Sequence, residues 1–220
     1  MLYKDPFIIA PQTFSLIQEL QALPELNEFY LVGGTALALQ MGHRNSIDID
    51  LFTTREFSPE DISIALNNKF SYRTTLSRKN TVLSVVNDIK TDFVRHDYKR
   101  LNEPITEEGI TFLGKEDIAA MKMHAIIQSG KRLKDFIDIY FLLEHFSMKQ
   151  LREFFSGKYP NTSTLIAVRA VNYFEDIDEN IDPPKMLNPI SLQAIKERIQ
   201  QATIFENKKF KHAIKSRHRK

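Results

Sequence analysis

Cysteine is absent from this sequence of 220 residues. Without cysteine there are no disulfides, no thiolate zinc sites and no cysteine nucleophiles, and the chain suits a reducing compartment. No apolar run approaches the ~20 residues that span a bilayer, and residues 1–6 lack the basic and apolar regions of a signal peptide. We therefore expect a cytoplasmic protein with no membrane partner, whose sites use oxygen or imidazole ligands.

Motifs of several common enzyme classes are also missing. The sequence contains no Gly-x-Gly-x-x-Gly, no Gly-x-Ser-x-Gly and no complete P-loop, in which Ser or Thr follows Gly-x-x-x-x-Gly-Lys. Their absence argues against dinucleotide enzymes, serine hydrolases and Walker-type ATPases. His96 and His124 have no second histidine or cysteine at ligand spacing, so we expect no zinc site at either position.

The periodicity of the sequence changes near Gly114. Before it, short runs rich in β-branched and aromatic residues predict strands at residues 29–32, 47–52, 72–77, 81–86 and 89–94, and the dipeptide Asn87-Asp88 predicts a hairpin between the last two. Helices are expected at residues 13–23, near Thr35 and after Ser58. After Gly114 the pattern predicts helices at residues 116–129, 135–146, 162–175 and 191–205. We therefore predict an α+β protein with two parts, residues 1–114 and residues 115–220.

A glycine turn followed by an acidic strand carries the chemistry of the first part. Gly33 and Gly34 can adopt positive φ and bring backbone N–H groups close to a phosphate, at the positive end of the following helix. On the strand at residues 47–52, the two-residue period places Asp48 and Asp50 on one face, with Cα atoms ~6.5 Å apart. Mg²⁺, or Mn²⁺ in its place, would neutralise the two carboxylates. The pattern therefore predicts a metal-bound phosphate site.

A third acid, Asp92, lies on the strand predicted at residues 89–94. Ile89 and Phe93 face the other way, so Asp92 stands in a core-like segment and needs a partner. We predict that it is the third metal ligand, and the alternative is an edge-strand acid that faces water. A second Asp-x-Asp pair, Asp176 and Asp178, has no glycine turn before it, and we expect it to lie on the solvated surface.

Four separated motifs resemble the AbiEii/AbiGii-like nucleotidyltransferase toxins of the polymerase-beta-like superfamily. The first two are the turn Gly33-Gly34-Thr35, with threonine where the family has serine, and the segment from His43 and Arg44 to Asp48-x-Asp50. The third is Lys122 on the first helix after the sheet. The fourth is Arg132-x-Lys134-Asp135-x-x-Asp138. The resemblance spans about residues 29–143.

The resemblance implies a nucleotidyltransferase-like mixed sheet with flanking helices in residues 1–114, followed by a helical C-terminal region, residues 115–220, that completes the active site. It implies transfer of a nucleotide from an NTP to an acceptor, with the tRNA 3′ end or another RNA expected, by the toxin of a bacterial toxin–antitoxin pair. A cognate antitoxin protein is then the expected partner. The catalytic residues expected are Asp48, Asp50, Asp92, Lys122 and Asp138. The nucleotide-binding residues expected are Gly33, Gly34, Thr35, Arg44, Lys122, Arg132, Lys134 and Asp135.

Several side chains have a second interpretation at this stage. Lys122 lies beside an apolar helix stripe and either neutralises pyrophosphate or extends from the stripe to solvent. Asp135 either faces the site or satisfies the start of its helix, and Asp138 either faces the site or pairs with Lys134 or Arg132. Arg44 either binds phosphate or holds the carboxylates. The whole domain either catalyses transfer or only binds nucleic acid or a partner protein.

The last thirteen residues are strongly basic. They contain seven cations and no acid: Lys208, Lys209, Lys211, Lys215, Arg217, Arg219 and Lys220. This tail either contacts a phosphate backbone or is a solvated helix end.

Overall fold

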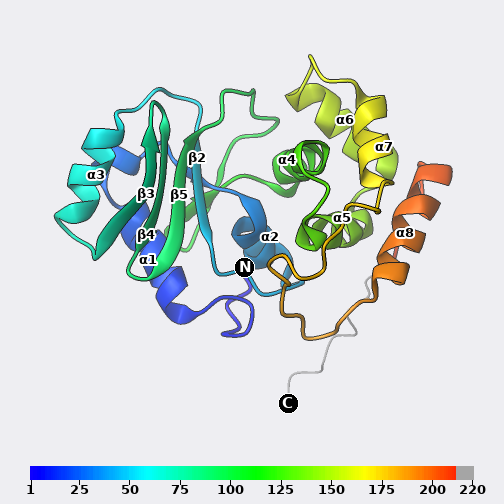
Figure 1. Ribbon diagram of the computed structural model, residues 1–220, viewed down its shortest axis with the longest axis horizontal. Coiled ribbons are helices and arrows are strands. Elements are labelled where there is room, and N and C mark those ends of the chain that lie inside the picture. Colours follow the sequence, from blue (N-terminus) through cyan, green and yellow to red (C-terminus); the bar gives the residue numbers. More distant parts are fainter. Residues whose placement is uncertain (212–220) are drawn as a thin grey trace. The chain divides into compact units, whose positions relative to one another are not determined.

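The structure, a computed structural model, describes residues 1–211 and divides the chain into two units, Met1–Gly114 and Lys115–Lys220 (Figure 1). The first unit contains the sheet and the second is helical. The α+β class is therefore confirmed. The basic tail is described only as far as Lys211, so its other four cations lie outside the described residues. Among residues 1–211, no helix has both the length and the apolar character needed to cross a bilayer.

One mixed sheet organises the described part of the first unit, in the order β3-β4-β5-β2-β1-β7-β6. Its strands are β1 (Tyr30–Leu31), β2 (Ile49–Thr53), β3 (Tyr72–Arg78), β4 (Thr81–Val86), β5 (Ile89–Arg95), β6 (Ile105–Glu107) and β7 (Ile110–Phe112). β2 pairs with β5 and β1 pairs with β7 in parallel, and the other pairs are antiparallel. The parallel pairing of β2 with β5 is the feature that later brings the acids together.

The predicted hairpin between β4 and β5 is confirmed. Asn87 and Asp88 have φ of 47° and 64°, the left-handed values that a two-residue hairpin turn requires. The β6–β7 hairpin was not predicted, because each strand has only three residues and shows too little alternation to reveal a period. Its turn also contains two residues with positive φ, Glu108 and Gly109.

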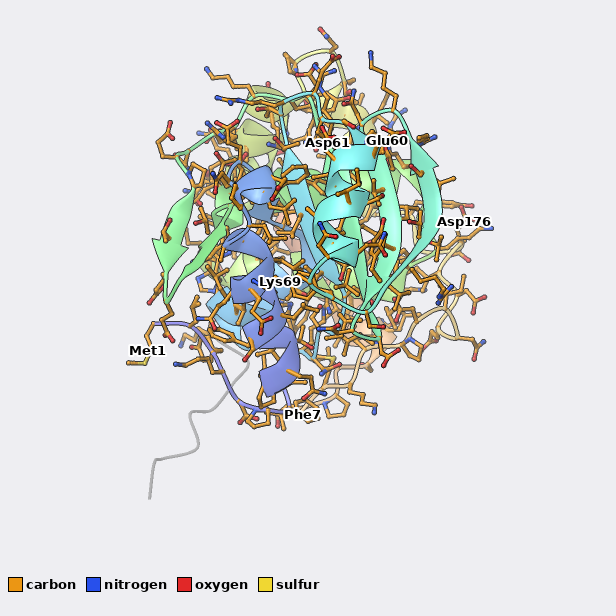
Figure 2. The ribbon with its side chains drawn as sticks, turned by 90° about the vertical axis from the view of Figure 1, so that its left-hand side faces the viewer. Met1, Phe7, Glu60, Asp61, Lys69 and Asp176 are labelled. Atoms are coloured by element: carbon orange, nitrogen blue, oxygen red, sulfur yellow. The ribbon has the colours of Figure 1, made fainter. Side chains whose placement is uncertain are left out.

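Three helices flank the sheet: α1 (Pro11–Gln21), α2 (Gly33–Met41) and α3 (Pro59–Asn67). Figure 1 shows α2 and α3 on opposite sides of the strands, and Figure 2 shows α1 and α3 together in front of the sheet. The Ser58 side chain caps α3 by accepting from the backbone N–H of Asp61, as its sequence predicts. Buried apolar residues of α1 and α3 and of the strands form the core on this face: Leu16, Ile17, Leu20, Ile62, Leu66, Val82, Val86 and Phe93.

The second strand begins later than predicted. β2 starts at Ile49, and Ile47, which was expected on its buried face, is 58% exposed. Asp48 therefore lies just before the strand. The period was correct for Ile49, Asp50 and Leu51, but the irregular segment before them carries Ile47 out of the sheet.

Five helices form the described part of the second unit: α4 (Lys115–Gln128), α5 (Leu133–His145), α6 (Met148–Lys158), α7 (Thr164–Val171) and α8 (Leu192–Ile204). α6 was not predicted. Its signal was present in the sequence, because Ser147 and Gln150 form a reciprocal capping box at its start. A fully buried ion pair, in which Lys158 Nζ lies 2.7 Å from Asp117 Oδ1, joins α6 to α4.

Candidate active site

Two carboxylates project side by side from neighbouring strands in the middle of the sheet. Asp50 of β2 is the direct partner of Asp92 of β5 in the parallel register. Adjacent strands lie ~4.8 Å apart, and directly paired residues project from the same face. This is the face of α2, because Asp50 Oδ2 lies against Gly33, the first residue of that helix. The sheet therefore assembles the predicted acidic pair with an acid 42 residues later in the sequence.

The three predicted metal ligands, Asp48, Asp50 and Asp92, all lie close enough to Lys90 to affect its charge. Burial by itself would lower the pKa of Lys90, but the charges of Asp92, Asp48 and Asp50 raise it overall. Its Nζ lies 3.3 Å from Asp92 Oδ2. Sequence reasoning missed Lys90, although it stands two residues before Asp92 and therefore on the same face of β5.

Asp92 is buried in the sheet, with 9% of its surface exposed. Its Oδ1 has no hydrogen-bond partner among residues 1–211. Burial raises the pKa of Asp92, Lys90 partly offsets the rise, and the charge of Asp48 adds to it. β5 is an interior strand between β4 and β2, so the alternative of an edge-strand acid facing water is wrong. Asp92 is a buried carboxylate whose charge is only partly compensated.

Replacing Asp92 with asparagine should therefore leave the fold at least as stable as the wild type near pH 7. A raised carboxyl pKa gives stability that is present below the unfolded value of about 4 and is lost as pH rises through the folded value. Asparagine cannot ionise, so its advantage should disappear below about pH 4. Thermal unfolding of both proteins at pH 4 and pH 7 measures this difference, and a lower Tm for the variant at pH 7 would contradict it.

The glycine turn holds α2 against the acids. Gly33 has φ of 69°, and a Cβ there would collide with Asp50 Oδ2. Gly34 has no positive φ, which corrects the expectation for this residue, but a Cβ there would collide with the Arg44 guanidinium. α2 begins at Gly33, two residues earlier than predicted. Its positive N-terminal end therefore lies beside the Asp50 carboxylate, which it stabilises electrostatically.

Gly33→Ala should lower the free energy of unfolding by more than the left-handed φ alone explains. We expect a loss of about 1–3 kcal/mol in the free energy of unfolding, from the strained φ together with displacement of Asp50. Gly109→Ala is the control, since Gly109 also has positive φ but its added Cβ would meet only Gln18 Nε2, at 3.5 Å. Urea unfolding compares the two, and equal losses would show that contact with Asp50 adds nothing.

Thr35 and Arg44 are both buried around this turn. Thr35 is 1% exposed, its Oγ1 lies 2.9 Å from Ser46 Oγ, and it donates a hydrogen bond to the Asp48 carbonyl. Arg44 is 2% exposed and its Nη1 donates to the Asn45 carbonyl at 2.9 Å. These contacts favour a role in positioning the acidic segment, and the nucleotide contacts expected of both residues stay predictions.

The acids of the second unit's motif enclose Lys122. Lys122 Nζ lies 2.7 Å from Asp135 Oδ1 and 2.8 Å from Asp138 Oδ2. All three residues are buried, with 7%, 2% and 0% of their surface exposed. Lys122 therefore does not extend to solvent. Asp138 pairs with Lys122, because α4 packs directly against α5.

The two remaining cations of this motif differ in exposure. The Arg132 side chain is 45% exposed, with Nε 3.9 Å from Asp135 Oδ2. Lys134 is buried and pairs with Asp182 of the loop before α8. Asp176 and Asp178 are exposed, as predicted. Arg132 is thus the motif cation most open to a ligand.

The residues present suit a magnesium ion that is completed by its substrate. Among residues 1–211, no group of three or more His, Cys, Asp or Glu side chains stands close enough to hold a metal ion by itself. Mg²⁺ commonly needs only one or two carboxylates, with water and substrate phosphate filling its other positions. Asp50 and Asp92 in register, with the unpartnered Asp92 Oδ1, provide such oxygen ligands.

Comparisons with known proteins agree with this architecture. The sequence model of the family "Nucleotidyl transferase AbiEii toxin, Type IV TA system" matches residues 15–79 and 67–216. An uncharacterized protein of Aquifex aeolicus (strain VF5) is 36% identical over 171 residues, which cover 75% of this chain and 82% of that protein. The family match confirms the resemblance that the motifs show.

Two solved structures share the fold at low sequence identity. A protein of H. pylori assigned to the nucleotidyltransferases is 15% identical, with a TM-score of 0.56, over 93% of this chain and 96% of its own. MenT4, a nucleotidyltransferase toxin of Mycobacterium tuberculosis, is 14% identical with the same TM-score, over 89% of this chain and 82% of its own. The nucleotidyltransferase fold is therefore shown, and the chain belongs to the AbiEii family of nucleotidyl transferase toxins of type IV toxin–antitoxin systems.

Proposed function

We propose that this protein transfers a nucleotide from an NTP to a hydroxyl of an RNA acceptor, with Mg²⁺ or Mn²⁺ as its cofactor. The tRNA 3′ end is the acceptor we favour. The observation that supports this proposal is the register of Asp50 with Asp92, beside a helix N-terminus that begins with Gly33. It joins a carboxylate pair suited to a metal with backbone N–H groups suited to phosphate.

In the proposed reaction the acceptor oxygen bonds to the α-phosphorus as the bond to pyrophosphate breaks. Asp48, Asp50 and Asp92 would hold the metal, which when bound neutralises the triphosphate and lowers the pKa of the acceptor hydroxyl. Asp92 Oδ1 is the buried atom available to an ion or to the departing hydroxyl proton. Gly33 leaves room for Asp50 to meet the helix terminus, and Thr35 holds the Asp48 backbone in place.

In this proposal, some residues of the second unit's motif hold its helices in position and another binds phosphate. Lys122 is held between Asp135 and Asp138, so contact with pyrophosphate would require its Nζ to serve a third anion. The ion-pair network first of all fixes α4 against α5. Arg132, whose side chain is 45% exposed, is the cation of this motif that we expect to contact phosphate directly.

The function is tested by incubating the protein with each α-³²P-labelled NTP, Mg²⁺ and total tRNA. We expect label in the tRNA with at least one NTP, none in the presence of EDTA and none with Asp48→Ala. The non-catalytic alternative is favoured by the lack of a preassembled three-ligand site among residues 1–211. It predicts equal labelling by wild type and Asp48→Ala, and that result would overturn the enzymatic proposal.

The toxin role needs a separate experiment. We propose that a cognate antitoxin protein accompanies this chain, as the family implies. Expression of the wild-type protein alone should arrest bacterial growth, Asp48→Ala should not, and the product of an adjoining gene should relieve the arrest. Growth arrest that persists with Asp48→Ala would separate toxicity from nucleotide transfer.

A further inference from the structure

The acids lie at one side of a broader sheet face formed by β5, β4 and β3. Residues that are direct partners across strands share a face, so the register identifies the members of two rows. One row continues from Asp50 through Asp92 and Leu83 to Leu76. The neighbouring row runs from Lys90 through Val85 to Arg73. We call the residues of these rows on β3, β4 and β5, together with Arg78, the acceptor face.

The acceptor face is the side of the sheet that α3 does not cover. On the α3 side, Val82, Ser84 and Val86 of β4 are buried, and Tyr72 Oη lies 2.9 Å from Ser63 Oγ of α3. On the opposite side, Leu76 is 42% exposed and the Lys90 side chain is 58% exposed. The acceptor face is thus open to solvent and continuous with Asp92.

A β-bulge places two arginines on the acceptor face together. Arg73 and Arg78 are five residues apart, so a regular strand would send them to opposite faces. The register of β3 with β4 shifts between Thr74 and Leu76, and after the shift Arg78 pairs with Thr81. Bulges re-aim side chains in this way. The irregularity therefore adds a second guanidinium to the side that carries the acids.

Apart from Asp92, the charged residues of the acceptor face are cations. β3 and β4 contain no acidic residue. Within residues 1–211, neither Arg73 nor Arg78 has an ion-pair or hydrogen-bond partner from another side chain, and both are exposed. Lys90 adds a third cation next to Asp92. Leu76, Leu83 and Val85 lie between these cations, so a ligand with regular negative charges and flat apolar groups would complement the face.

We propose that the acceptor face binds the single-stranded end of an RNA acceptor and directs its terminal hydroxyl toward Asp92. The proposal rests on the proposed function and specifies where its acceptor lies. Arg73, Arg78 and Lys90 contact phosphates, the guanidinium planes and the apolar side chains contact unstacked bases, and the row from Leu76 to Asp92 leads to the reacting centre. Recognition by charge and stacking places no requirement on RNA sequence.

The binding test uses a 12-nucleotide single-stranded RNA, labelled with fluorescein at its 5′ end, and fluorescence anisotropy between 50 and 300 mM KCl. At the lower salt concentrations, Arg73→Glu/Arg78→Glu should weaken binding by more than about tenfold. The slope of log K against log salt is negative, and it should become shallower by about 0.7 for each phosphate that the variant no longer neutralises. Arg73→Lys/Arg78→Lys should retain most of the affinity, because it preserves the charge.

A matched control separates local contacts from net charge. Lys69, exposed at the end of α3 (Figure 2), lies on the covered side of the sheet, and Lys69→Glu changes the charge by the same amount as Arg78→Glu. Arg78→Glu should weaken RNA binding severalfold and Lys69→Glu should not. Equal effects of the two variants, or wild-type affinity in the double arginine variant with an unchanged circular dichroism spectrum, would overturn the proposal. Loss of antitoxin binding with intact RNA binding would assign the face to a protein and would overturn it too.

Transfer assays distinguish this inference from the proposed function. If wild type labels tRNA and the double arginine variant does so with an unchanged KM for tRNA, the acceptor face does not bind the acceptor, and the enzymatic proposal stands. If wild type binds the RNA through Arg73 and Arg78 but labels nothing, the enzymatic proposal fails, and with it the orientation toward Asp92, while the binding surface remains. A raised KM for tRNA with an unchanged KM for NTP supports both.

Discussion

Asp50→Asn is expected to reduce nucleotide transfer by more than about 100-fold while the protein stays folded. Loss of one group that stabilises transition-state charge commonly costs 10²–10³ in rate, about 3–4 kcal/mol. Asparagine keeps the volume and one oxygen of Asp50 but removes the charge that a divalent ion needs. Initial rates of label incorporation at saturating NTP measure the effect, with Tm as the check on folding.

Asp176→Asn is the control for this substitution. Asp176 belongs to the other Asp-x-Asp pair of the chain and is exposed. It should retain wild-type transfer, since the same change in charge occurs outside the site. Comparable rates for Asp50→Asn and wild type, with tRNA as acceptor, would remove the acidic pair from the mechanism.

Lys122→Met should lower the free energy of unfolding by about 3–5 kcal/mol, which is the usual cost of breaking a buried ion pair from one side. The substitution leaves Asp135 and Asp138 buried next to each other, at 2% and 0% exposure, without the ammonium group between them. That loss should be visible as a lower Tm and a lower urea midpoint.

A neutral version of the network provides the control. Lys122→Met/Asp135→Asn/Asp138→Asn has no buried charge at these positions and should recover much of the lost stability. If Lys122→Met unfolds at the same urea concentration as wild type, the two carboxylates are not buried in solution as they are in the structure. Recovery of stability without recovery of transfer would support a functional role for the charges beyond holding α4 to α5.

Local sequence patterns predicted much of the first unit because they reflect the backbone preferences of residues that are close in the sequence. The alternation around Ile49, Asp50 and Leu51 fixes which side chains point to one face, and Asn87-Asp88 accepts the left-handed backbone of a hairpin turn. Patterns failed where a feature depends on a neighbour. The strand predicted at residues 29–32 is present as β1, but its antiparallel pairing with β2 and its parallel pairing with β7 could not be predicted from its own residues.

The bulge in β3 shows the same limit. The period of two predicts opposite faces for Arg73 and Arg78, and only the register with β4 reveals that they share one. Lys122 is a related case, since its position beside the apolar stripe of α4 could be read from the sequence but its two carboxylate partners could not. Those partners come from α5, 13 and 16 residues later in the sequence.

The sequence by itself determined the α+β class, the family motifs and the alternation that puts Asp50 on the face opposite Ile49 and Leu51, because each follows from backbone preferences and spacing over a few residues. Tertiary structure alone decided that Asp92 meets Asp50, that Lys90 stands among the acids, and that Lys122 is enclosed by Asp135 and Asp138. The physical reason is that strand pairing and helix packing join segments far apart in the chain, and the burial that shifts or compensates their charges exists only after folding.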